Sequence, residues 1–237
     1  MSTTAPLKNV ALCTSALEQA MERPQHLPGL VAFYGPSGWG KTVSATYANN
    51  KFRAYYVAVK ESWTRAAFLK AVLKEMGETP ERTNYEMVDQ VSEQLALSGK
   101  PLIIDEMDHV VNRNMVELIR DIYEGSNAAI LMIGEEHLEK NLRRWERFHN
   151  RVLDWVPAQP TDMMDIQHLA RLYCKGVKVT DDLLAHLLRQ NKGITRRICV
   201  NLERFRRFAL AEGLTTLDLN TWGDRDIYTG TAPKRRV

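Results

Sequence analysis

A glycine-rich segment in the first fifth of the chain has residue types and spacing that suit phosphate binding. The letters GPSGWGKT fit the pattern GxxxxGK[ST], and they lie between a short apolar run and a helical pattern. Glycines let backbone N–H groups point at phosphate oxygens, and the helix that follows adds its positive end. A plain glycine-rich turn is the alternative. We expect ATP to bind at Gly35, Pro36, Ser37, Gly38, Trp39, Gly40, Lys41, Thr42 and Val43.

Two of these residues have specific chemical roles in the expected site. The Lys41 ammonium would neutralise the β and γ phosphates and so assist catalysis, and the Thr42 hydroxyl would ligate Mg²⁺. A second apolar run, at 102–104, ends in two carboxylates. Asp105 can bind Mg²⁺ through water, and Glu106 can polarise the attacking water. The alternative is an acidic N-cap for the next helix, a role that also suits Asp108.

ATP hydrolysis also needs positive charge near the γ-phosphate in the transition state. The segment at 143–151, RRWERFHNR, is rich in arginine, although ordinary surface arginines would look the same. A second arginine pair, Arg196 and Arg197, follows Gly193 where a helix begins. One of that pair could fold onto the nucleotide.

The elements that must position these residues alternate between strand and helix. Strand-like runs lie at 30–34, 53–59, 101–104, 128–133 and 152–156, and helical patterns at 9–21, from Lys41, and at 63–76, 86–98, 114–123 and 138–148. The runs are continuously apolar, which predicts a parallel sheet covered on both faces. After Pro160 we expect helices at 163–173, 181–190 and 195–210 and no strand. The fold class is therefore α/β, with a core at 1–157, a small helical lid at 158–226 and a basic tail at 227–237.

Composition excludes several other classes of protein. With 237 residues, 44% of them hydrophobic and 26% charged, the chain suits a globular protein rather than a disordered or collagen-like one. Its 32 basic and 29 acidic residues leave a net charge of +3, too small to prove a nucleic-acid partner. Three distant cysteines without CxxC spacing, and histidines without HExxH spacing, predict no disulfide and no transition metal. We expect a cytoplasmic protein without membrane contact, because no apolar run approaches roughly 20 residues.

The motifs together resemble the AAA+ ATPases. The resemblance runs from about residue 7 to residue 210 through GPSGWGKT, LIIDEMDH, a strand ending in MIGEE, RFHNRV and a GxxR in the helical lid. The phrase IGEEHLEKNLRRWERFHNRV and the short core are similar to the DNA-transposition ATPases, the group of the phage Mu B protein and the Tn-type target-selection regulators. The resemblance implies a P-loop AAA+ sandwich. It also implies that Arg151, or Arg147, is an arginine finger for a neighbouring subunit, and that Arg196 is sensor 2.

One position departs from the family pattern. The sensor 1 residue is usually Asn, Thr or Ser at the end of the fourth core strand, whereas Gly134 and Glu135 stand there in this chain. Glu135 would repel phosphate unless it binds water or a neighbour, so this departure predicts slow turnover unless Glu135 lies aside.

The transposition group assembles into ATP-dependent filaments on duplex DNA without sequence preference. Its DNA-facing segment follows the second core strand, which here implies phosphate contacts from Lys60 and Arg65 and a backbone hydrogen bond from Thr64. An ordinary helix cap at Ser62 or Thr64 is the alternative. The implied partners are duplex DNA, other copies of the chain and a transposase, in a bacterial or phage-infected cytoplasm. Two other functions stay open: a helicase loader or replication-initiation ATPase, and an ATP-binding switch with little turnover.

Overall fold

The computed structural model describes residues 5–231, and these form two compact units. The α/β unit comprises residues 9–37 and 41–158. The helical unit comprises the residues from Gln159 onward, together with the described residues up to Lys8 and residues 38–40. Each unit has its own hydrophobic core.

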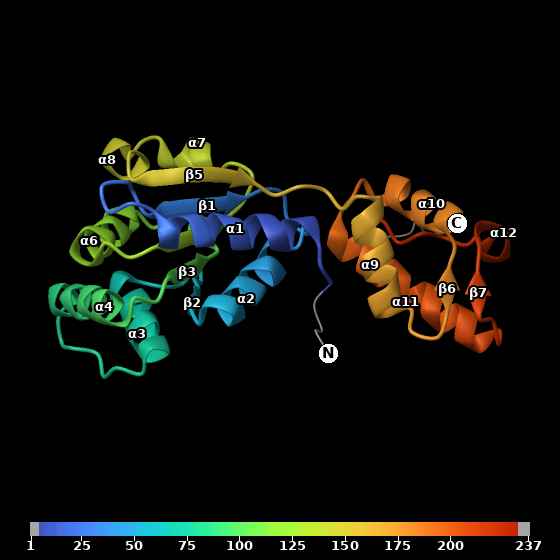
Figure 1. The fold of residues 1–237 in the computed structure, drawn as a ribbon, viewed down its shortest axis with the longest axis horizontal. Helices are drawn as coiled ribbons and strands as arrows, with labels where there is room; N and C mark the ends of the chain where they lie inside the picture. Colours follow the sequence, from blue (N-terminus) through green and yellow to red (C-terminus); the bar gives the residue numbers. More distant parts are fainter. Residues whose placement is uncertain (1–4, 232–237) are drawn as a thin grey trace. The chain divides into compact units, whose positions relative to one another are not determined.

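A five-stranded parallel sheet forms the centre of the α/β unit (Figure 1). Its strands lie in the order β2-β3-β4-β1-β5, and β4 therefore separates β1 from β3. The predicted parallel sheet is confirmed, and its central strands are buried along their length because helices cover both faces. The strand bounds are β1 Leu30–Tyr34, β2 Tyr55–Ala58, β3 Leu102–Asp105, β4 Ile130–Gly134 and β5 Val152–Pro157.

Helices with a buried apolar face pack around this sheet, and α4 lies against both α3 and α6 (Figure 1). Local signals explain several of their ends. Thr83 and Glu86 form a capping box at the start of α4, and Gly77 ends α3 in the left-handed conformation. The helices are α1 Lys8–Glu22, α2 Lys41–Phe52, α3 Arg65–Met76, α4 Asn84–Ser98, α5 Met107–Asn112, α6 Val116–Ser126, α7 Leu138–Leu142 and α8 Glu146–His149.

One helix prediction in this unit was wrong, and another was displaced by two to three residues. The pattern at 138–148 is not one helix, because Trp145 leaves the helical conformation and packs partly buried against the core between α7 and α8. The helix expected at 114–123 begins at Val116 instead, because Asn114 is left-handed (φ 52°) and ends the turn after α5. No sequence pattern predicted α5.

The helical unit contains α9 Met163–Tyr173, α10 Asp181–Asn191, α11 Thr195–Ala211 and α12 Leu219–Trp222. The prediction that it lacks strands was wrong, since β6 Lys178–Val179 pairs in parallel with β7 Thr216–Leu217. Two-residue strands are too short to show a periodic pattern. The Lys8 backbone N–H donates to Asp165 Oδ1 (2.9 Å) within this unit. The predicted basic tail extends beyond Thr231 and so lies partly outside the described residues.

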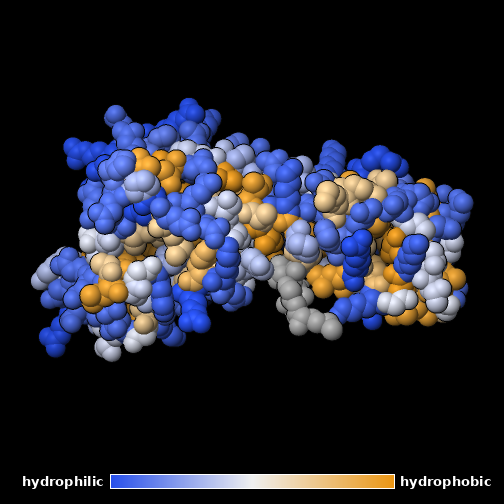
Figure 2. Space-filling view, viewed as in Figure 1, coloured by the Kyte–Doolittle hydropathy of each residue, from blue (hydrophilic) through white to orange (hydrophobic). Residues whose placement is uncertain are grey.

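The surface is mostly hydrophilic on the face shown in Figure 2, with separate hydrophobic patches. Large apolar side chains that are well exposed include Tyr85, Leu97 and Met164. Within residues 5–231, no helix combines the length and the apolar character that crossing a membrane requires.

Candidate nucleotide-binding site

The glycine-rich loop connects the carboxyl end of β1 to the first turn of α2, where a phosphate-binding loop must lie. The Gly35 backbone N–H donates to the Gly134 carbonyl oxygen at the end of β4 (3.3 Å). Gly38 and Gly40 have φ values of 84° and 82°, a region that residues with a Cβ rarely enter. The sequence therefore needs glycine at these positions to form the loop.

The side chain of Lys41 folds back onto its own loop. Its Nζ donates to the carbonyl oxygens of Gly35 (2.6 Å) and Pro36 (3.0 Å). These contacts occupy N–H donors of the ammonium group that could otherwise donate to phosphate oxygens. Burial lowers the Lys41 pKa, and nearby carboxylates oppose that shift. The carboxylates come from the ends of β3 and β4 and from α5: Glu135, Asp105, Glu106 and Asp108.

Asp105 is only 3% exposed and has a partner on each carboxylate oxygen. Oδ1 accepts from the Glu106 backbone N–H (2.8 Å), and Oδ2 accepts from the Tyr56 hydroxyl (2.8 Å). The pKa of Tyr56 is raised, first by burial and then by this hydrogen bond. Tyr56 was not among the residues predicted for this site. No motif marks it, and only the pairing of β2 with β3 brings it beside Asp105.

Glu106 follows Asp105 and has an exposed side chain. Its backbone is left-handed (φ 58°, ψ 43°), which costs about 1–3 kcal/mol in a residue other than glycine. Glu106 occupies the N-cap position of α5, but its side chain makes no capping hydrogen bond. The carboxylate is thus not used as a helix cap, and it is available for contact with water.

Asp108 does not act as a cap either, because its side chain crosses to β4. Oδ2 accepts from the Glu135 backbone N–H at 2.6 Å, and burial raises the Asp108 pKa. A Cβ at Gly134 would lie 2.6 Å from Leu138 Cδ2 and 2.9 Å from Asp108 Oδ2, so a side chain at this position would push those side chains aside. The departure at the sensor 1 position is therefore a packed arrangement of Gly134, Glu135 and Asp108. The Glu135 side chain is exposed. Its charge is the largest of those that oppose the lowering of the Lys41 pKa by burial.

The oxygen donors at this edge of the sheet suit Mg²⁺. Thr42, the second residue of α2, is exposed, and each Asp105 oxygen keeps a second lone pair beside the hydrogen bond that it accepts. Among the described residues, no three His, Cys, Asp or Glu side chains are grouped to bind a metal by themselves. Phosphate oxygens and water would have to complete the coordination of the ion.

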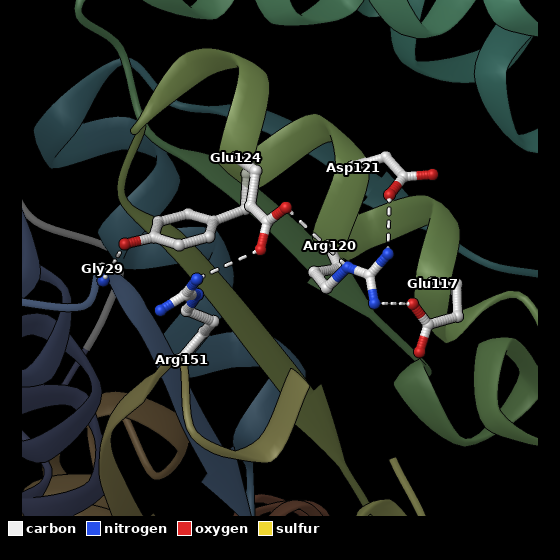
Figure 3. Close-up of polar contacts among 7 residues, drawn as sticks. Gly29, Glu117, Arg120, Asp121, Glu124 and Arg151 are labelled. Atoms are coloured by element: carbon white, nitrogen blue, oxygen red, sulfur yellow. Dashed lines mark hydrogen bonds and ion pairs between the residues drawn. The ribbon is translucent and has the colours of Figure 1, made fainter. Parts of the chain in front are cut away.

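The two arginine-finger candidates, Arg151 and Arg147, differ in their side-chain contacts. Arg151 directly precedes β5, and its Nη2 donates to Glu124 Oε1 (3.3 Å) (Figure 3). Arg120 also approaches Glu124 (Nε to Oε2, 3.9 Å) and contacts Glu117. Arg147 is exposed on α8, and its side chain makes no hydrogen bond or ion pair with any residue in 5–231. Neither candidate is hydrogen-bonded to the carboxylates around Lys41.

Arg196 is the second residue of α11, in the helical unit, and is exposed. It follows Gly193, which is left-handed (φ 70°) and where a Cβ would lie 2.6 Å from Pro160 Cβ. Near it, the hydroxyls of Thr195 and Thr161 are hydrogen-bonded to each other (2.7 Å). The start of α11 is thus firmly placed within its own unit. A contact between Arg196 and a nucleotide stays a prediction.

The segment expected to face DNA connects β2 to α3. Lys60 is exposed, and Arg65, the first residue of α3, donates from Nη2 to the Asn114 carbonyl oxygen (3.4 Å). Thr64 is the N-cap of α3, since its Oγ1 accepts from the Ala67 backbone N–H (3.3 Å). Thr64 therefore has the helix-capping role that was the alternative to DNA contact. Its hydroxyl hydrogen can still be donated to another group.

Comparison with known proteins agrees with this arrangement. Residues 25–142 match the AAA domain family, and no curated protein matches the sequence. Similar solved structures include the ORC2 protein of Aeropyrum pernix with ADPNP and ADP (TM-score 0.66, 14% identity, covering 92% of this chain and 67% of that one). Others are the A. pernix ORC1 protein in complex with DNA (0.64, 16%, 90% and 62%) and the Thermotoga maritima RuvB Holliday junction branch migration motor (0.61, 16%, 92% and 67%). At these identities the likeness concerns the fold, and the chain spans 62–67% of the length of these proteins.

Proposed function

We propose that this chain, which has the P-loop AAA+ fold and an AAA domain over residues 25–142, is an ATP-dependent, DNA-binding ATPase. It would assemble into oligomers or filaments on duplex DNA. Its role would be to mark target DNA and activate a transposase, as the resemblance to the transposition ATPases suggests. The partners are then duplex DNA of any sequence, further copies of the chain and the transposase.

The observation that carries the ATPase proposal is the arrangement around Lys41. Its ammonium contacts two carbonyls of its own loop and lies near carboxylates from two strand ends. ATP would displace the loop carbonyls and supply phosphate oxygens to Lys41. Bound Mg²⁺ would neutralise developing charge on the phosphates. Glu106 would then orient and polarise water, while Thr42 would bind Mg²⁺ directly and Asp105 would bind it through water.

The proposal of DNA binding rests on two exposed basic residues and on fold likeness. Lys60 lies on the β2–α3 connection, and Arg65 is the first residue of α3. Lys60 and Arg65 could each neutralise a phosphate, which positions a protein on DNA without reading sequence. The ORC1 protein of A. pernix was solved with DNA, and RuvB is a branch migration motor. With a net charge of only +3, one subunit would bind DNA weakly, so affinity would come from many linked subunits.

Two observations favour other functions. The fold likeness to the ORC proteins favours a helicase loader or replication-initiation ATPase, which would act through a partner helicase. The carboxylate of Glu135 near Lys41 favours a switch that holds ATP with little turnover, because it would oppose phosphate charge.

Electron microscopy of the protein with duplex DNA and either ATP or ADP tests the proposal. Regular filaments on DNA that form with ATP and not with ADP support it, and Lys41→Ala protein serves as the control that should form none. Isolated rings or monomers that bind ATP would favour the replication function or the switch. Absence of DNA binding at low salt would overturn the DNA part of the proposal.

A further inference from the structure

The short helix α5 joins the Glu106 end of β3 to a turn at Arg113 and Asn114. A left-handed residue other than glycine lies on each side of it, Glu106 (φ 58°) and Asn114 (φ 52°). Such residues are uncommon because Cβ is crowded in that conformation, and they concentrate at functional and switch segments. A left-handed residue therefore lies at each end of α5, and at Glu106 this conformation is held at an energetic cost.

The turn after α5 contacts the segment proposed to face DNA. Arg113 Nε donates to the Glu61 carbonyl oxygen at 2.7 Å. Arg65 makes the longer contact to Asn114, and the Trp63 backbone N–H donates to the Lys60 carbonyl oxygen (3.0 Å). Residues 60–63 thus form a turn that leads to Thr64, the N-cap of α3, and Arg113 contacts this turn at the residue next to Lys60.

The same segment is also joined to Asp105 through β2. The Val59 backbone N–H donates to the Asp105 carbonyl oxygen (3.0 Å), and Tyr56 donates to the Asp105 carboxylate. Lys60 follows Val59 directly. Residues 60–65 are therefore connected to the proposed nucleotide site twice, through β2 beside Asp105 and through α5 after Glu106.

We propose that Arg113 is a positioning residue that holds residues 60–65 for contact with DNA phosphates and couples them, through α5, to the nucleotide state sensed at Glu106. This inference rests on the proposed function, since it requires that segment to bind DNA. Coupling between two ligands is reciprocal, so ATP must raise DNA affinity by the same factor by which DNA raises ATP affinity. Loss of Arg113 must then reduce both factors equally.

Arg113 is exposed, and it could instead contact a phosphate itself. A double-mutant cycle separates the two roles, because residues that act through one another are not additive. If Arg113 acts through the segment, Arg113→Ala should weaken DNA binding little further once Lys60 and Arg65 are alanine. If it is an independent phosphate contact, the two effects should add.

The experiment compares Arg113→Ala and Arg113→Lys with Asn112→Ala, a change at the neighbouring exposed position of α5. Hydrogen exchange of the amides at 61–64 is measured without nucleotide or DNA. DNA affinity is then measured with and without a non-hydrolysable ATP analogue, and analogue affinity with and without DNA. We expect faster exchange in Arg113→Ala, a coupling factor that falls from about 5–150-fold toward 1 in both directions, partial recovery in Arg113→Lys and wild-type behaviour in Asn112→Ala.

Unchanged exchange, or unchanged coupling in a protein that binds DNA, would overturn this inference and leave the proposed function standing. Additive effects in the double-mutant cycle would also overturn it. If the wild-type protein binds no DNA, the proposed function fails and the DNA role of Arg113 fails with it, whatever the exchange result.

Discussion

Arg151 Nη2 lies 3.3 Å from Glu124 Oε1, so the first candidate for an arginine finger is ion-paired within its own subunit (Figure 3). The Arg151 side chain is half exposed, and exposed pairs contribute about 0–1 kcal/mol. Exchanging Glu124 for a neighbouring subunit's γ-phosphate would therefore cost little. Arg151→Ala should lower ATP turnover by about 10³–10⁵-fold while each subunit still binds ATP. Steady-state phosphate release and nucleotide titration measure the two quantities.

Mixing experiments test whether this arginine acts between subunits. Arg151→Ala protein added to Glu106→Gln protein should recover part of the activity, because some mixed interfaces pair an intact finger with an intact Glu106. Arg143→Ala is the matched control, since Arg143 is also exposed and pairs with Glu139 on α7 (2.7 Å). If Arg147→Ala protein, and not Arg151→Ala protein, recovers activity when mixed with Glu106→Gln protein, Arg147 is the arginine finger. Constant specific activity on dilution of the wild type, with no recovery in any mixture, would exclude a shared site.

Lys41 and Glu106 should separate ATP binding from hydrolysis. Lys41→Ala removes the ammonium that would bind the phosphates and should abolish tight ATP binding. Glu106→Gln keeps size and shape and removes only the group that polarises water, so it should bind ATP and not hydrolyse it. Fluorescent nucleotide titration and phosphate release measure both effects. Equal ATP affinity in wild type and Lys41→Ala would contradict the assignment of the site.

Tyr56 should affect the metal rather than the nucleotide. Its hydroxyl donates to Asp105 Oδ2 at 2.8 Å, and partners that orient a metal-side carboxylate typically change metal affinity by about 10–100-fold. Tyr56→Phe should therefore raise the Mg²⁺ concentration for half-maximal turnover by about tenfold, with little change in ATP affinity without Mg²⁺. Tyr55→Phe, at the neighbouring position of β2, is the control. An unchanged Mg²⁺ dependence in Tyr56→Phe would show that the hydroxyl does not orient Asp105.

Local patterns were enough to predict the sheet and the loop. The strand β1 was predicted with its observed bounds, and the prediction for β3 was displaced by one residue. Both strands could be predicted because continuous apolar segments are distinct in sequence. The glycine spacing placed Lys41 at the start of α2 without tertiary information. Each of these features depends on neighbours within a few residues.

Features set by contacts between distant residues could not be predicted. Tyr56 and Asp105 are 49 positions apart, and Asp108 and Glu135 are 27 apart, so only strand register and the course of α5 bring them together. The break between α7 and α8 likewise depends on where Trp145 packs. Tertiary packing overrode a helical pattern there.

DNA binding should respond to salt in proportion to the phosphate contacts that each subunit makes. Lys60 and Arg65 are exposed on the β2–α3 connection, and each phosphate contact releases counterions from DNA. Binding to duplex DNA should require ATP, show little sequence preference and weaken as salt rises. Lys60→Ala and Arg65→Ala should each reduce the slope of log affinity against log salt by about 1 per subunit. Fluorescence anisotropy over a salt series measures the slope, and Lys74→Ala, an exposed lysine in the last turn of α3, should leave it unchanged. A slope insensitive to Lys60 and Arg65 would place the DNA interface elsewhere, and tight binding to one sequence only would contradict recognition of the DNA backbone.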